Sequence, residues 1–372
     1  MTDVETWLQA WDSQGTHRTG TAGDHAGADW LAGEVAALGA RPVIEPFTFD
    51  RLDPEETWLE IGGTRIDAVP VFDSPACNGI TGPLSLTDGP VRVVELSPQA
   101  VYAEPYRMMR RDGGHQALVI ICQGAKPGLG LLNAEQFRAP YGAPAIHVSS
   151  EARDRVRDAA ERGLAATFVS RARRTRTEAR NVVVTLSGRQ PGGTKLVVMT
   201  PRSSWWQSTA ERGGGIVCWL ETLRALLAEP PACDVVMTAN SGHELGHLGL
   251  DAFLEHRPGW DSAGGATWVH YGANLGARGG TLSIMSASED LRASMRTSLQ
   301  QEGQPPDSLA PMSQVPSGET RDIHRAGGRY VTLVGSNPLF HLPQDRWPHA
   351  VDVDAIRRIA AASARMVRDL SR

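Results

Sequence analysis

The feature that most constrains the fold is a regular alternation of apolar runs and amphipathic segments from Asn181 onwards. The apolar runs include KLVVMT, CDVVMTA, TWVHYGA and RYVTLVG, which have the length and β-branched content of buried strands. Between them, the spacing of apolar residues predicts helices at Gly215–Ala228, Ser288–Gln301 and Val353–Leu370, and another after Glu244. This alternation predicts an α/β layer structure with helices on both faces of the sheet.

The first half of the chain has a different texture. A helical stripe at Ala26–Leu38 and the strand-like run PVIEPFTF come first. From 51 to 180, short β-like runs are separated by Gly and Pro, with one helical segment at Glu151–Arg162. We therefore expect 1–50 and 181–372 to form one discontinuous domain, and 51–180 a β-rich insert. The insert is expected either to cover the cleft or to mediate formation of a homodimer, and its residues do not distinguish these roles.

Charge and cysteine content bear on the cellular context. The formal net charge is −5, and the one dense basic stretch, RARRTRTEAR at Arg171–Arg180, has no interleaved aromatic residues. It predicts a solvated hairpin or linker, with no nucleic-acid partner. The four cysteines form no CxxC pair, the first residues are acidic, and no apolar run approaches the roughly 18 residues that span a bilayer. We expect buried free thiols in a cytoplasmic protein with no membrane partner.

Residues that could bind a metal or take part in catalysis follow the predicted strands. They comprise Glu211 after KLVVMT, then His243, Glu244 and His247 after CDVVMTA, and His341 after RYVTLVG. Ligands in open α/β sheets bind beyond the carboxyl ends of the strands. These residue types are those that bind zinc in proteins.

Residues 243–247, HELGH, match the pattern HExxH. On a helix, histidines at this spacing bind zinc and the glutamate activates water. However, Gly246 weakens a helix, and Ser241-Gly242 follows the preceding strand directly. A zinc-binding helix and a chance pattern therefore both stay open.

Three further segments resemble, in order and spacing, those of a known family: HRTGTAGDHAGADWLAGEVAALGARP, EARNVVVTLSG and FHLPQDRWPHAVDVDAI. The family is the metal-dependent aminopeptidases with co-catalytic zinc, whose superfamily also contains glutaminyl cyclases and the transferrin receptor. The resemblance implies a zinc-aminopeptidase-like mixed sheet covered by helices on both faces. It also implies that 51–180 is a protease-associated-like insert.

The family's metal ligands are only partly present. Its first motif falls on Pro201-Arg202-Ser203, and a later acidic ligand falls on Gly276, so the first metal loses ligands. Glu211, Glu244 and His341 match the ligands of the second metal. The resemblance therefore implies one divalent metal, zinc, with His243 in the place of the family's glutamate base.

Further residues are candidates for binding substrate. Arg202 and Arg212 flank the emptied metal position, where one guanidinium could bind a substrate carboxylate, although Arg212 could instead pair with a nearby acid. Trp205 and Trp206 could form a hydrophobic wall of the substrate site, or they could have only a packing role in the core. His270 could be a core residue or a ligand, and His324 could line the cleft.

The resulting hypothesis is a metal-dependent hydrolase acting on an amide, a peptide or a related small molecule, with His243 as acid and base. A variant makes His243 and His247 the ligands and Glu244 the base. The alternative is a catalytically inactive pseudo-peptidase that binds a small molecule or a protein partner in the cleft that is the active site in the family.

Overall fold

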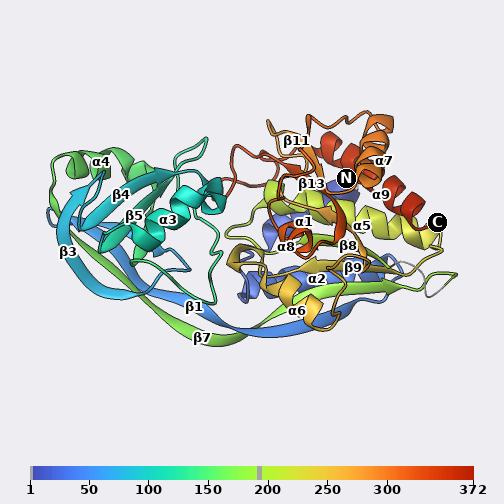
Figure 1. Ribbon diagram of the computed structural model, residues 1–372, viewed down its shortest axis with the longest axis horizontal. Helices are drawn as coiled ribbons and strands as arrows, with labels where there is room; N and C mark the ends of the chain where they lie inside the picture. Colours follow the sequence, from blue (N-terminus) through green and yellow to red (C-terminus); the bar gives the residue numbers. More distant parts are fainter. Residues whose placement is uncertain (1–2, 191–194) are drawn as a thin grey trace.

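The computed structural model describes residues 3–190 and 195–372, which form two lobes (Figure 1). The larger lobe holds most of the helices, and the smaller lobe comes from the middle of the first half of the chain. Two long antiparallel strands, β1 (Val43–Ile61) and β7 (Ala165–Leu186), pair along their length and run through both lobes. The predicted limits of the insert, at residues 51 and 180, fall inside these strands.

The sheet of the larger lobe has parallel strands at its centre. These are β8 (Leu196–Pro201), β9 (Val235–Asn240), β10 (Thr267–Tyr271) and β13 (Arg329–Gly335), in the order β9-β8-β10-β13. On one side β7 pairs antiparallel with β9, and on the other β11 (Leu282–Ser286) pairs antiparallel with β13 and is followed by β12 (Ser308–Leu309). The sheet is therefore mixed.

Helices cover both faces of this sheet. One face packs against α1 (Asp3–Ser13), α2 (Ala22–Ala37), α5 (Gly214–Ala228), α7 (Glu289–Gln301) and α9 (Val353–Leu370), and the other against α6 (Leu248–Glu255) and α8 (Thr320–Arg325). Neighbouring residues of β7 point to opposite faces of the sheet. Val182 and Val184 pack in the core on the face covered by α5 and α9, and Val183 packs in the core on the face covered by α6 and α8. The predicted α/β layer with helices on both faces is confirmed.

The smaller lobe has its own sheet. Strands β4 (Val91–Leu96), β5 (Ala117–Cys122) and β6 (Ala145–Val148) are parallel, and β2 (Thr64–Pro70) and β3 (Cys77–Ser85) flank them. The helical segments are η1 (Pro98–Tyr102), α3 (Glu104–Asp112), η2 (Ser150–Ala152) and α4 (Arg153–Glu161). Every residue of β5 is buried, because a hydrophobic cluster lies on each of its faces. A protease-associated identity for this lobe stays a prediction.

The predicted hairpin or linker at Arg171–Arg180 is wrong, because these residues lie in the middle of β7. Acidic residues on the neighbouring strand β1 form ion pairs with these arginines, such as Arg171 with Glu56 and Arg173 with Glu55. Opposite charges across a strand pair stabilise it. The basic stretch is thus one half of a charge-paired ribbon.

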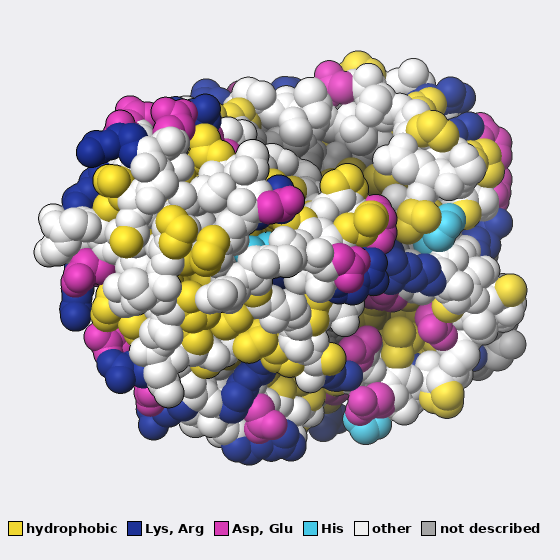
Figure 2. Space-filling model, turned by 60° about the vertical axis from the view of Figure 1, so that its left-hand side comes forward, with side chains coloured by type: hydrophobic (Ala, Val, Ile, Leu, Met, Phe, Trp, Pro, Cys, Tyr) yellow, Lys and Arg dark blue, Asp and Glu magenta, His cyan; other side chains and the backbone are white. Residues whose placement is uncertain are grey.

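Two further expectations concern the molecule as a whole. All four cysteines are free, as predicted, but only Cys122 and Cys218 are buried, whereas Cys77 and Cys233 are partly exposed. Within the described ranges, the helices are too short or too polar to cross a bilayer. Basic and acidic side chains lie close to one another on the face in Figure 2, with hydrophobic side chains scattered between them.

Candidate active site

The carboxyl ends of the four parallel strands meet at one edge of the sheet. Eight buried polar side chains at or near this edge each have at least one nitrogen or oxygen without a hydrogen-bond partner. They are Glu211, Arg212, His243, His247, His270, Asn274, Glu319 and His341. More than about 90% of buried polar groups in proteins are hydrogen-bonded, so this concentration of exceptions indicates a place built for a ligand or for chemistry.

Glu211 and Arg212 lie in η3 (Thr209–Gly213), a π-helical turn that leads into α5. Such turns often occur at functional sites. Glu211 Oε1 is 2.7 Å from Nη2 of Arg212 and 3.5 Å from Nε2 of His341. Burial acts to raise the pKa of Glu211, but Arg212 and His341 outweigh burial and lower the pKa to about 2. Glu211 is therefore ionised and belongs to an ion pair.

Glu244, a predicted metal ligand, is fully engaged elsewhere. One carboxylate oxygen accepts hydrogen bonds from the backbone N–H and the hydroxyl of Thr19, at 2.8 and 2.7 Å. The other oxygen accepts a hydrogen bond from the Ser203 hydroxyl at 2.6 Å. Burial raises the pKa of this carboxyl, and the hydrogen bonds from Ser203 and Thr19 act against burial. These contacts tie together three separate segments and disfavour the ligand role.

The HExxH pattern does not lie on a helix. His243–Leu245 forms the short turn η4, and α6 begins only at Leu248. Gly246 and His247, between them, have positive φ angles of 76° and 66°. The two histidines therefore do not share a helical face, although their ring centroids are 5.2 Å apart. Because Glu244 is held by Thr19 and Ser203, the variant with Glu244 as base is also disfavoured.

The two predicted substrate-binding arginines differ in their environments. Arg202 is buried against Asp24, with Nη1 2.8 Å from Oδ1, and also donates to the backbone oxygens of Asp24 and Arg180. Arg212 donates from Nε to the Ser203 carbonyl at 2.7 Å and its Nη2 is paired with Glu211, but its Nη1 has no hydrogen-bond acceptor. Arg212 is therefore the better candidate for binding a ligand.

The predicted aromatic wall and His324 have other contacts. Trp205 is buried, packs on Phe72 with the ring centroids 4.5 Å apart and the rings tilted by 37°, and donates to Asn133, so it joins the two lobes. Trp206 donates to the carbonyl oxygen of His341 at 2.9 Å. His324 contacts the hydroxyl of Tyr330 through Nδ1 at 3.1 Å. These contacts favour packing roles for all three.

His243 and His270 line a small cavity of about 120 Å³. A second hollow, of about 480 Å³, lies between the lobes and is lined by both acids and arginines, including Glu135, Arg321 and Asp322. The small cavity has room for a few waters or one small chemical group.

Glu319 is the residue that the sequence did not reveal. It is completely buried just before α8, with Oε1 3.9 Å from Nδ1 of His243 and no hydrogen bond to that oxygen. Burial raises its pKa to about 7. Its surroundings in the sequence, PMSQVPSGETRD, are rich in Pro, Ser and Gly and read as an exposed loop. No local pattern signals that this glutamate is buried.

Neither a protein-family model nor a curated protein sequence matches this chain. Solved structures do. A zinc aminopeptidase from Bacillus subtilis aligns over 99% of this chain and 94% of that chain, with a TM-score of 0.78 and 18% identity. An aminopeptidase from Aneurinibacillus sp. strain AM-1 aligns over 100% and 94%, with a TM-score of 0.72 and 13% identity. A glutaminyl cyclase from Bacteroides thetaiotaomicron aligns over 98% and 95%, with a TM-score of 0.52 and 8% identity.

These similarities confirm the zinc-aminopeptidase-like fold and the resemblance to that superfamily. They concern the fold, because identities of this size leave individual residues free to differ. The site must therefore be judged from its own contacts.

The ligand set that the resemblance implies does not fit a metal. Glu244 is saturated by Thr19 and Ser203, and Glu211 is paired with Arg212. Across residues 3–190 and 195–372, no group of three or more His, Cys, Asp or Glu side chains is placed so that it could hold a metal as it stands. In this arrangement the carboxylates of Glu211 and Glu244 are engaged by other protein groups.

Proposed function

We propose that this chain is a hydrolase of the aminopeptidase type that cleaves an amide bond in a small substrate bound beside Arg212 and His243. The observation that carries the proposal is a buried polar cluster at the carboxyl edge of an aminopeptidase-like sheet, in which Nη1 of Arg212, Nδ1 of His243 and Oε1 of Glu319 have no hydrogen-bond partner. A purely structural cluster would be expected to pair these atoms with one another.

Arg212 supplies the positive charge in this proposal. Its Nε is fixed to the Ser203 carbonyl and its Nη2 is paired with Glu211, while Nη1 has no hydrogen-bond acceptor. A fixed cation in a buried site is well suited to bind a carbonyl oxygen and to stabilise the negative charge that develops on it during hydrolysis. Glu211 holds the guanidinium in place.

His243 is the proposed proton acceptor. Burial, together with the charges of Arg212 and the neighbouring histidines, keeps its pKa well below the usual value. The imidazole is therefore neutral at pH 7 and can take a proton from an attacking water molecule and return it to the leaving amine. Its Nδ1 has no hydrogen-bond partner.

The substrate class follows from charge. In the family that the sequence resembles, a glutamate base is expected where this chain has His243, and a neutral imidazole binds a free ammonium group less well than a carboxylate does. Amides and N-acyl amino acids, which lack that ammonium group, suit the site better than free peptides. The small cavity of about 120 Å³ favours a small group beside His243 and His270.

The test is turnover of a panel of amides, N-acyl amino acids and free peptides. We expect N-acyl substrates to be cleaved, and Arg212→Met and His243→Gln to lower kcat by about 100-fold or more. Arg173→Met, on the exposed ribbon, is the matched control and should retain activity. Full activity in both site variants would reject the proposed roles.

A second candidate is a pseudo-peptidase that binds the same ligands without turnover. It is favoured by the loss of the inherited ligand set, since Glu244 is bound by Thr19 and Ser203. It would give calorimetric binding of N-acyl amino acids that requires Arg212, and no product from any member of the panel.

Several further predictions from the sequence are proposed together with this function. They are a cytoplasmic location, which the free cysteines support, a homodimer through the insert, and the absence of nucleic-acid and membrane partners.

A further inference from the structure

The small cavity at the carboxyl edge is formed by residues at the ends of three parallel strands. His243 follows β9, His270 lies in β10 with Asn274 in the turn after it, and Gly335 ends β13. The smaller lobe contributes Tyr102 of η1 to the same lining. Both lobes therefore form this cavity.

The lining of the cavity is uncharged. In the part of the chain that the structure describes, neither a carboxylate nor a Lys or Arg side chain lines it. Two groups of opposite charge, Glu319 and Arg212, act on His243 from outside the lining. An ionised ligand group would lose its water shell here without an opposite charge in the lining, so the cavity suits a neutral group.

Asn274 holds one fixed acceptor without a partner in this cavity. Its Nδ2 donates to the Gly335 carbonyl at 3.2 Å, and its backbone N–H donates to the Glu211 carbonyl at 2.9 Å. Because a carbonyl oxygen can only accept, we assign the amide nitrogen of Asn274 to the side that faces Gly335. Oδ1 then has no hydrogen-bond partner, although only 5% of the residue is exposed. A buried acceptor of this kind is costly unless another molecule satisfies it.

The backbone at Asn274 does not require this side chain. The residue has a φ of 67°, in the left-handed region, which glycine adopts without strain and asparagine tolerates better than most other residues. Residues other than glycine cost free energy in this region and cluster at ligand-binding sites. Glycine would satisfy the turn, and the asparagine adds an amide whose oxygen faces no protein donor.

His243 and Asn274 share one small space. A methyl group on Gly318 would lie 3.4 Å from Cε1 of His243 and 3.8 Å from Cε1 of His270, so the two rings border the same volume. At about 120 Å³, the cavity holds one small chemical group. A substrate amide that lies beside His243 therefore also adjoins Asn274.

We propose that Oδ1 of Asn274 accepts a hydrogen bond from the N–H of the substrate amide, and thereby selects amides that carry an N–H over esters and N-methylated amides. This inference rests on the proposed function for the identity of the reacting bond, and it adds the residue that selects that bond. An ester oxygen can only accept, so it leaves Oδ1 buried without a donor, and an N-methyl group takes the place of the hydrogen. A site that is built to bind an N–H rejects analogues without one for this reason.

The experiment compares N-acetylalanine with two analogues that lack the N–H, O-acetyllactate and N-acetyl-N-methylalanine, on the full chain. Calorimetry gives the affinity of each compound that is not cleaved, and kcat/KM is measured for each compound that is. The variant is Asn274→Gly, which suits the positive φ, and circular dichroism checks its folding. Ser336→Ala is the matched control, because this exposed hydroxyl follows β13 and bonds to Thr281 outside the cavity.

We expect the wild type to bind the amide about 10- to 100-fold more tightly than either analogue. Asn274→Gly should reduce this preference to less than about 3-fold by weakening the amide alone, and Ser336→Ala should retain it. Since esters are intrinsically more reactive than amides, the decisive kinetic quantity is the change in the amide-to-ester ratio of kcat/KM on substitution.

The outcomes separate this inference from the proposed function. Cleavage of the amide with a preference that Asn274→Gly leaves unchanged would keep the hydrolase and overturn the role of Asn274. Binding of the amide that requires Asn274, without cleavage, would retain that role and reject the hydrolase. A folded wild type that shows no preference for the N–H compound, or that neither binds nor cleaves it, would also overturn the inference.

Discussion

Replacing Glu244 tests whether this residue is a structural anchor or a metal ligand. Its two oxygens accept three hydrogen bonds from Thr19 and Ser203, at 2.6 to 2.8 Å, and the residue is fully buried. Hydrogen bonds to a charged group contribute roughly 1.5–3 kcal/mol each, and their losses are not additive. Glu244→Ala leaves three buried donors without an acceptor, so we expect the free energy of unfolding to fall by about 4–5 kcal/mol. Glu244→Gln keeps one acceptor oxygen and should lose about 1–3 kcal/mol.

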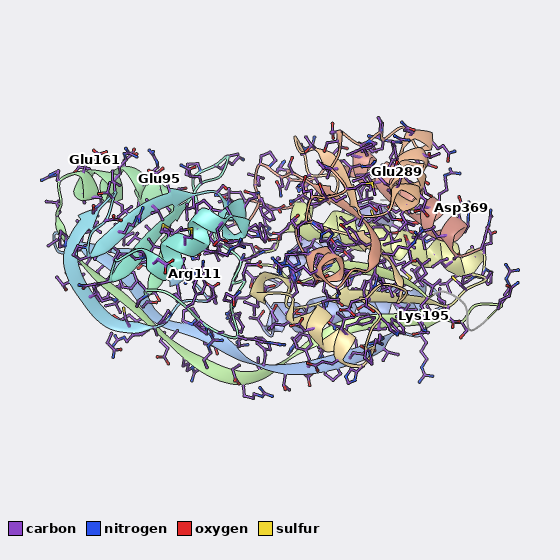
Figure 3. All side chains as sticks on the ribbon, in the orientation of Figure 1. Glu95, Arg111, Glu161, Lys195, Glu289 and Asp369 are labelled. Atoms are coloured by element: carbon purple, nitrogen blue, oxygen red, sulfur yellow. The ribbon has the colours of Figure 1, made fainter. Side chains whose placement is uncertain are left out.

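The assay is thermal unfolding followed by circular dichroism, with metal content measured on the same samples. At about 2 °C per kcal/mol for a chain of this size, Glu244→Ala should unfold roughly 8–10 °C earlier. Glu161→Ala, on the outer edge of the smaller lobe in Figure 3, is the control and should change little. The structural role of Glu244 is refuted if Glu244→Ala unfolds at the wild-type temperature while it loses bound metal.

Three further outcomes are expected. Burial lowers the pKa of His147 to about 3, so its unfolded form binds a proton below pH 6.5 and its native form does not. The free energy of unfolding should therefore fall as the pH falls from 6.5, by up to about 1.4 kcal/mol per unit for this group, and His147→Gln should flatten that slope in urea titrations at several pH values. Arg202→Met leaves Asp24 buried without its ion-pair partner and should cost about 3–5 kcal/mol in the same titrations, whereas a change below about 1 kcal/mol would show that the pair is dispensable. Gly318→Ala places a methyl group 3.4 Å from the ring of His243 in a backbone with φ +71°, so it should weaken binding of N-acyl substrates; unchanged affinity would exclude the small cavity as the substrate site.

Patterns with a clear period were sufficient to predict most of the larger lobe. The helix at Val353–Leu370 has the predicted bounds, and the apolar runs at β8, β9, β10 and β13 form the parallel centre of the sheet. The local sequence is enough to predict these elements, because a helix must bury one apolar stripe and a central strand must bury both of its faces. The stretch Arg171–Arg180 was misjudged for the opposite reason. Its place in a strand depends on β1, more than a hundred residues earlier, which supplies the opposing acids.

The sequence predicted some of the residues that gather at the candidate site, but few of their contacts. Parallel strands bring Glu211, His243 and His341 to one edge, as expected from their positions after apolar runs. What each residue does depends on contacts across the chain, such as that of Thr19 with Glu244, which no local pattern encodes. Glu319 was missed because its flanking sequence is that of an exposed loop.

The central claim is that Arg212 and His243, and not the inherited ligand set, form the substrate site. A crystal structure of the full chain with an uncleaved analogue of an N-acyl amino acid tests this most directly. We expect the carbonyl oxygen of the analogue to lie within hydrogen-bond distance of the Arg212 guanidinium, with His243 beside the amide. An analogue that binds away from both residues, or a metal bonded to Glu211, Glu244 and His341 beside it, would contradict the claim.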